Sequence, residues 1–195
     1  MKNFILSYLN NSLSAKEKLL SAPGTIAAVE AAAAMIISAY RIGNKVLVAG
    51  NGGSAADAQH MAGELVSRFF FDRPPLSAIA LTTDTSIITA IGNDYGYEEV
   101  FSRQLRANGQ DGDIFIAIST SGNSLSIIKA LYAAKEKGIV SVGFTGENSC
   151  QMDELCDCII KVPSVCTPHI QEMHITLIHI LCALVEATLF QRESP

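Results

Sequence analysis

His60 and Glu64 are the two residues of the sequence best placed to move protons or bind a metal. They lie four positions apart in the stretch "GNGGSAADAQHMAGEL" (residues 50–65), and on a helix that spacing puts both side chains on one face. An imidazole and a carboxylate can exchange protons near neutral pH, and both are common metal ligands. Such a pair alone is more often an ordinary surface interaction, but the glycine-rich loop directly before it favours a site.

A second group of polar residues lies in the apolar C-terminal segment, and it comprises Gln171, Glu172, His174 and His179. Buried imidazoles normally need a hydrogen-bond partner, so one of these histidines is equally explained as a satisfied core residue. Gln171 and His179 lie eight residues apart, which is about 12 Å along a helix and roughly 80° in direction. They can meet one ligand only by reaching toward each other or by coming from different subunits.

The loop "STSGNS" (residues 119–124) carries four hydroxyl groups between a predicted strand and a predicted helix. In a parallel sheet this is the carboxyl end of a strand, where ligands usually bind. The free N–H groups of a helix start favour an anion, and the hydroxyls add hydrogen bonds. The loop therefore predicts a site for a sugar phosphate. The alternative is that these residues only form the turn and cap the helix, although a cap needs just one side chain.

The glycine-rich loop and a third strand end contribute further candidates for ligand contacts. The glycine-rich loop comprises Asn51, Gly52, Gly53 and Ser54, and the third strand end adds Thr83, Asp84, Asn93 and Asp94. Glycines let the backbone approach a ligand closely, so we expect a polyol chain to lie across this loop. Neither the dinucleotide fingerprint nor the P-loop motif is present, which disfavours a nucleotide. Asp84 is more simply explained as a helix cap.

Five apolar, β-branched runs alternate with segments of helical periodicity. The runs span residues 45–50, 76–81, 113–119, 139–145 and 156–162, and the helical segments between them span residues 54–70, 85–107, 123–137 and 149–155. Nearly continuous apolar runs are typical of strands that are covered on both faces. The alternation predicts an α/β fold in which a parallel sheet lies between layers of helices.

Length and charge restrict the class of protein. A chain of 195 residues with 49% hydrophobic residues is expected to form one domain, residues 1–195. Its net charge of -5 and its pI of about 5.3 argue against nucleic acid as a partner. The first residues lack the features of a secretory signal, so a cytoplasmic protein is expected.

Two segments, residues 25–41 and 170–190, are apolar on nearly every face. A helix without a polar face must be buried, and a domain of this size cannot easily cover two of them. We therefore expect a homo-oligomer, with the N-terminal helical segment 1–42 and the C-terminal helix in the subunit contacts. The longest apolar run, residues 26–40, is short for a bilayer span and contains Glu30, so no membrane segment is expected.

The cysteines form an odd set without the spacing of a zinc ribbon or a disulfide framework. They are Cys150, Cys156, Cys158, Cys166 and Cys182. We expect reduced thiols that pack as small hydrophobic groups, with Cys156 and Cys158 on one face of a strand.

Four segments of the sequence, in order, resemble the phosphoheptose isomerase family within the sugar isomerase (SIS) domain superfamily. They are "AGNGGSAADAQHMAGEL", "TDTSIITAIGNDYGYEEVFSRQ", "AISTSGNS" and "IQEMHITLIHILC". The likeness covers nearly the whole chain and is weakest over the first 40 residues. It implies a flavodoxin-like, three-layer αβα sandwich with a five-stranded parallel sheet. It also implies a homotetramer with active sites between subunits.

The resemblance implies roles for individual residues. Glu64 and His179 match the family's catalytic acid/base pair. The residues that match zinc ligands, one ion to each active site, are His60, Glu64, Gln171 and His179. The residues that match substrate contacts are Asn51, Gly52, Gly53, Ser54, Glu64, Asn93, Asp94, Ser119, Thr120, Ser121, Ser124 and Gln171, with the serine-rich loop binding the phosphate. Pro168 and His169 lie at the expected edge of the pocket.

The implied reaction converts sedoheptulose 7-phosphate, a ketose, to D-glycero-D-manno-heptose 7-phosphate, an aldose, as the first step toward bacterial surface heptose. One carboxylate and one imidazole suffice for this isomerisation through an enediol. We expect Glu64 to move the carbon-bound proton and His179 the complementary one, with the reverse assignment also open. Zinc would polarise the carbonyl group.

The main alternative is a non-catalytic module of the same superfamily that binds the bacterial replication initiator DnaA, as a paralogue of similar sequence does. That paralogue lacks the groups that match Glu64 and His179, so the sequence favours the enzyme. Isomerases of other sugar phosphates, such as amino sugars and hexulose phosphates, are further alternatives.

Overall fold

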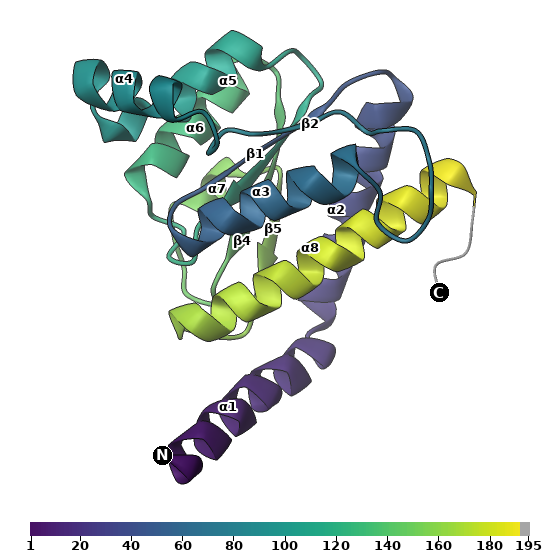
Figure 1. The fold of residues 1–195 in the computed structure, drawn as a ribbon, viewed down its shortest axis with the longest axis vertical. Helices are drawn as coiled ribbons and strands as arrows, with labels where there is room; N and C mark the ends of the chain where they lie inside the picture. The colour runs from purple at the N-terminus through teal and green to yellow at the C-terminus, as the bar shows by residue number, and fades with distance from the viewer. Residues whose placement is uncertain (192–195) are drawn as a thin grey trace.

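Five parallel strands form one sheet in the order β2-β1-β3-β4-β5 (Figure 1). The strands are β1 (Val46–Gly50), β2 (Ala78–Ala80), β3 (Ile114–Ile118), β4 (Val140–Thr145) and β5 (Cys158–Lys161). The computed structural model describes residues 1–191, so the last four residues of the expected domain 1–195 lie outside the described part. Strands β1 and β3 are buried at every residue, as their continuous apolar runs predict.

Helices cover both faces of the sheet. They are α1 (Lys2–Leu20), α2 (Pro23–Arg41), α3 (Gly53–Val66), α4 (Thr85–Tyr95), α5 (Ser102–Asn108), α6 (Leu125–Glu136), α7 (Met152–Leu155) and α8 (Thr167–Phe190), with a 3₁₀ turn η1 at Tyr97–Glu99. Residues of α2, α3 and α8 share one apolar core with one face of the sheet. Residues of α4, α5, α6 and α7 share a second core with the other face. The predicted three-layer αβα sandwich is confirmed.

The chain reverses its winding direction between β1 and β3, which are neighbours in the sheet. Helix α3, which follows β1, packs on one face, and α6, which follows β3, packs on the other. Such a switch point leaves a crevice at the carboxyl ends of the two strands, where α/β proteins bind ligands. The glycine-rich loop follows β1 and the serine-rich loop follows β3, so both open into this crevice.

Two predictions at the level of elements are wrong. The predicted helix 85–107 is broken at Gly96, whose φ of 94° lies outside the helical region, so α4, η1 and α5 replace one long helix. Cys156 and Cys158 do not share a strand face. Cys156 caps α7 and packs with the α6 side of the sheet, whereas Cys158 begins β5 and packs with the α2 side.

Helices α1, α2 and α8 leave apolar surface uncovered. In Figure 1, α1 projects away from the sheet as the purple helix, and it exposes Phe4, Ile5, Leu9 and Leu13. By length and composition alone, α2 and α8 could each cross a membrane, with 33% and 44% of their most apolar windows buried inside the fold. Both helices pack against the sheet and against each other, which is the position of core helices.

Candidate functional site

Helices α3 and α8 lie side by side and bring His60, Glu64 and His179 together. His60 Nε2 is 3.1 Å from Glu64 Oε1 and 2.9 Å from His179 Nε2. One candidate ligand atom from each of the three side chains lies within 4.8 Å of the others. Because His179 is 119 positions from His60, only the tertiary packing of the two helices creates this triad of side chains.

The triad has the donor set of a catalytic zinc site, namely two imidazole nitrogens and a carboxylate oxygen. Two neutral imidazoles can form a hydrogen bond between their Nε2 atoms only when one ring carries its proton on Nε2. Alternatively, a metal cation between the rings would be coordinated by the lone pair of each Nε2. His60 and Glu64 keep 43% and 27% of their side-chain surface exposed, so a substrate can reach them. The residues present therefore fit a metal ion with an open coordination position.

Gln171, the fourth predicted zinc ligand, lies near the start of α8. Its side chain lies against Gly53 at the start of α3, where a Cβ on Gly53 would be 2.5 Å from Gln171 Nε2. His60 is seven residues further along α3, which is about 10 Å at 1.5 Å per residue. The structure thus brings His60, Glu64 and His179 together and places the Gln171 side chain beside the glycine-rich loop. Gln171 stays a predicted fourth ligand.

The glycine-rich and serine-rich loops meet through Asn51. Its Nδ2 donates to Ser124 Oγ at 2.9 Å and to Ser126 Oγ at 3.0 Å. Its Oδ1 accepts a hydrogen bond from the Tyr97 hydroxyl at 2.8 Å. The turn after β3 is possible because Gly122 has a φ of 65°, which other residues rarely adopt.

The serine-rich loop lies between two hollows. Thr120 and Ser121 line a polar cavity of about 280 Å³ together with Ser164 and Thr167. On the other side, Asn51, Tyr97 and Ser124 border a more open hollow of about 360 Å³. Ser119 is buried at the end of β3, and Ser54 is buried in the first turn of α3. Hydroxyl groups from the loop therefore face space large enough for a phosphate group.

The side chains of the third predicted strand end make local hydrogen bonds. Asp84 caps α4 by accepting a hydrogen bond from the Ile87 N–H at 2.9 Å, as the simpler explanation predicts. Asn93 donates to Asp94 at 2.8 Å, and both are exposed on α4. Within residues 1–191, the hydrogen bonds of their side chains do not reach the triad or the serine-rich loop.

His174 is a buried core histidine with a partner at Nε2, whereas its Nδ1 has no hydrogen-bond partner among the described residues. One ring nitrogen lies 3.2 Å from the Thr145 carbonyl oxygen, and burial lowers the pKa of the imidazole to about 4. His169 is also buried, and its ring packs 5.0 Å from that of Tyr8 on α1. Glu172 accepts a hydrogen bond from Ser12 of α1. Apart from Gln171 and His179, the polar residues of this segment therefore serve packing and helix contacts.

Three residues near the candidate site are not predicted by the sequence analysis, namely Asp57, Tyr97 and Ser126. Asp57 precedes His60 by three positions on α3, a spacing that signals a shared helix face. Burial raises the pKa of its carboxyl group to about 6, opposed by the nearby His60, and one of its oxygens has no partner among the described residues. Tyr97 gave no such signal, because its bond to Asn51 spans 46 positions.

Comparisons with known proteins agree with this geometry. The SIS domain family matches residues 7–146. The chain is 59% identical to a phosphoheptose isomerase of Aneurinibacillus thermoaerophilus over 193 residues, which cover 99% of this chain and 98% of that protein. It is 57% identical to phosphoheptose isomerase 2 of Campylobacter jejuni, with 97% of this chain and 94% of that protein covered.

A solved structure gives the same result for the fold. The phosphoheptose isomerase of Neisseria gonorrhoeae superimposes with a TM-score of 0.89 at 39% identity, covering 95% of this chain and 98% of that one. The resemblance of four short segments thus extends over the whole chain in both sequence and structure. The chain belongs to the phosphoheptose isomerase family of SIS-domain proteins.

Proposed function

We propose that the protein converts sedoheptulose 7-phosphate to D-glycero-D-manno-heptose 7-phosphate, the first step of bacterial heptose biosynthesis. The observation that carries this proposal is the meeting of Glu64 and His179, from two different helices, in a triad with His60. A carboxylate and an imidazole at this distance can transfer a proton between neighbouring carbons and serve the neighbouring oxygens. Family membership adds the sugar phosphate as the class of substrate.

Glu64 is the proposed base for the carbon-bound proton, and His179 the proposed partner for the proton on oxygen. The reverse assignment uses the same two groups. His60, Glu64, Gln171 and His179 are the proposed holders of a zinc ion, which when bound would polarise the substrate carbonyl and stabilise the enediolate. A metal-bound carboxylate is a poorer base, so Glu64 must exchange partners during turnover to act on carbon.

The two loops are the proposed holders of the substrate. Hydroxyl and backbone N–H groups of Ser119, Thr120, Ser121 and Ser124 bind the phosphate. Asn51, Gly52, Gly53, Ser54 and Gln171 bind the polyol chain across the start of α3, which fits the contact between Gln171 and Gly53. Asn93 and Asp94 stay predicted substrate contacts.

A homotetramer with sites between subunits is the proposed assembly, in the cytoplasm. Within one chain, Asn51 and the serine-rich loop lie at the start of α3, whereas His60 and Glu64 are about 10 and 16 Å further along its axis. A second copy that placed its own phosphate loop beside the triad would close this gap. The helical segment 1–42 supports the proposal, because α1, α2 and α8 line an apolar groove of about 450 Å³.

The direct test incubates the purified protein with sedoheptulose 7-phosphate, with added zinc and with a chelator. The aldose product is expected, in larger amount with zinc. An absence of product under both conditions, together with tight binding to the replication initiator DnaA, would support the non-catalytic alternative. Glu64 and His179 already disfavour that alternative, because the protein places both in one cluster.

A further inference from the structure

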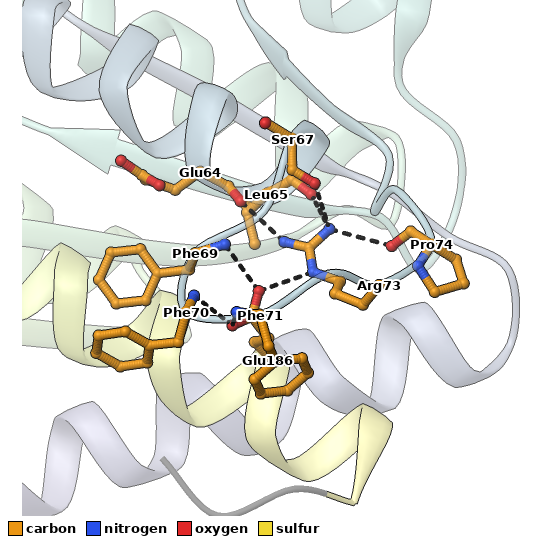
Figure 2. Close-up of polar contacts among 9 residues, drawn as sticks. All are labelled: Glu64, Leu65, Ser67, Phe69, Phe70, Phe71, Arg73, Pro74 and Glu186. Carbon is orange, nitrogen blue, oxygen red and sulfur yellow. Dashed lines mark hydrogen bonds and ion pairs between the residues drawn. The ribbon is translucent and has the colours of Figure 1, made fainter. Parts of the chain in front are cut away.

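A buried ion pair joins the segment after α3 to α8 (Figure 2). Arg73 Nε donates to Glu186 Oε2 at 2.9 Å, and both side chains are almost completely buried. Glu186 also accepts hydrogen bonds from the backbone N–H groups of Phe69 and Phe70, at 2.8 and 2.7 Å. Burial opposes ionisation of Glu186, but these donors outweigh it and hold the pKa of the carboxyl group below its usual value.

Arg73 uses its remaining nitrogens to close the end of α3. Its Nη2 donates to the Glu64 carbonyl oxygen at 2.8 Å, and its Nη1 donates to the Leu65 carbonyl oxygen at 2.7 Å. The last carbonyl groups of a helix lack partners within the helix, and here one planar guanidinium supplies them. Arg73 therefore contacts the backbone of the residue whose side chain belongs to the triad.

Glu186 is linked to the other side of the triad. It lies seven residues after His179 on α8, which is about two turns along the same helix face. The backbone of Phe69, which Glu186 holds, brings the Phe69 ring to 5.6 Å from the His179 ring. One ion pair thus contacts the backbone of Glu64 directly and limits the position of His179 through Phe69.

We propose that Arg73 and Glu186 are positioning residues for the isomerisation: they fix the separation of α3 and α8 at which His60, Glu64 and His179 meet. This inference rests on the proposed function. The pair touches none of the three side chains in the triad, so it acts through the backbone of Glu64 and the ring of Phe69. Burying two charges is costly, and an apolar pair can be as stable, so a role in geometry explains the pair better than stability alone.

The test compares Arg73→Lys and Glu186→Gln with a matched control, Asp113→Asn. Asp113 is also fully buried in an ion pair, with Lys45 Nζ at 2.6 Å, and also accepts backbone N–H groups. Its side chain bonds to Lys45 and Gln110, which lie outside α3 and α8. All variants are assayed with sedoheptulose 7-phosphate well below their unfolding temperatures, and Co²⁺ affinity is measured by absorption titration.

The expected loss at Arg73→Lys and Glu186→Gln is about 10- to 100-fold in kcat and in Co²⁺ affinity, the range for residues that support metal ligands. KM should stay within about threefold, because the two substrate loops are untouched. Asp113→Asn should lower the unfolding temperature and leave kcat and Co²⁺ affinity unchanged. A loss confined to stability would not produce this split.

Three outcomes would overturn the inference: unchanged kcat and Co²⁺ affinity in both variants, equal losses in Asp113→Asn, or failure of both variants to fold. The proposed function fails separately, when the wild-type protein turns over no sedoheptulose 7-phosphate. In that case the Co²⁺ titration still decides the inference, since it reports on the triad without turnover.

Discussion

At the scale of single residues, Glu64 has two proposed roles, because it belongs to both the proposed acid/base pair and the proposed metal set. Its Oε1 is 3.1 Å from His60 Nε2, and its carbonyl oxygen accepts a hydrogen bond from Arg73. The side chain can therefore be changed without touching the backbone contact that ends α3.

Glu64→Gln should lower kcat by about 10²- to 10⁴-fold, the range for loss of a general acid or base. Binding of the sugar phosphate should persist, because the serine-rich loop is intact. Steady-state kinetics and calorimetric titration with the product measure the two effects. Gln59→Ala, an exposed change on the same helix, serves as the control. Normal turnover in Glu64→Gln, or loss of its folded circular dichroism spectrum, would contradict the assignment.

His174 makes stability depend on pH. Its folded pKa of about 4 lies below the ordinary value of 6.5, so the unfolded chain binds a proton more readily than the folded one. The stabilisation is complete above pH 6.5 and is lost as the pH falls toward 4, by about 3 kcal/mol in all.

The check is urea unfolding of wild type and His174→Gln at pH 7.5 and 4.5, at one protein concentration. Glutamine keeps a donor for the Thr145 carbonyl oxygen but does not titrate. The wild type should lose more unfolding free energy than the variant between the two pH values. An equal loss in both proteins would show that His174 is not the titrating group.

At the scale of elements, the register between α3 and α8 decides which residues meet. Gly53 meets Gln171 and His60 meets His179, so the two helices run parallel with matched spacing (Figure 1). A change at Gly53 should therefore affect Gln171 without affecting the triad.

Gly53→Ala should fold normally and bind substrate less well. The backbone of Gly53 suits alanine, and the clash at 2.5 Å is with the far end of a flexible side chain, so stability should change by at most about 1 kcal/mol. The displaced Gln171 amide should raise KM by up to about tenfold, the worth of one hydrogen bond. Gly63→Ala on the same helix meets nothing within 4 Å and should leave KM unchanged. Equal KM values for the two variants would argue against a substrate role for Gln171.

Element types can be predicted from the sequence more fully than the contacts between them. Continuous apolar runs locate all five strands within about two residues at each end, because burial on both faces leaves a local pattern. The break of the predicted helix 85–107 at Gly96 could not be predicted, since one glycine within helical periodicity does not reveal its φ angle. The candidate site shows the same division. The spacing of His60 and Glu64 is local and correctly indicates one helix face, whereas the distance from Gln171 to His60 depends on helix register, which the sequence does not display.

At the scale of the whole molecule, the apolar surface of α1 is too large to be left in water. Leu9 and Leu13 lie one turn apart and are exposed by 59% and 58%, although neither supports the fold of its own chain. The proposed tetramer supplies the missing cover.

Leu9→Asp combined with Leu13→Asp should therefore weaken assembly while the chain stays folded. Light scattering should show the wild type at four times the 20.8 kDa of one chain and the variant at a lower mass. Tyr132→Asp, on the exposed side of α6 with 52% exposure, is the matched control and should keep the wild-type mass. An unchanged mass for the α1 variant would show that this surface is not a subunit contact.

The distance along α3 between the serine-rich loop and the triad has a genetic consequence. An allele with Ser121→Glu would repel phosphate, and an allele with Glu64→Gln would lack the base, so each alone would be inactive. In the proposed tetramer with sites between subunits, the two kinds of chain expressed together would co-assemble, and about a quarter of the shared sites would pair an intact loop with an intact triad. Two defective genes would then restore isomerase activity that neither supports alone, whereas sites built from single chains would give no such rescue.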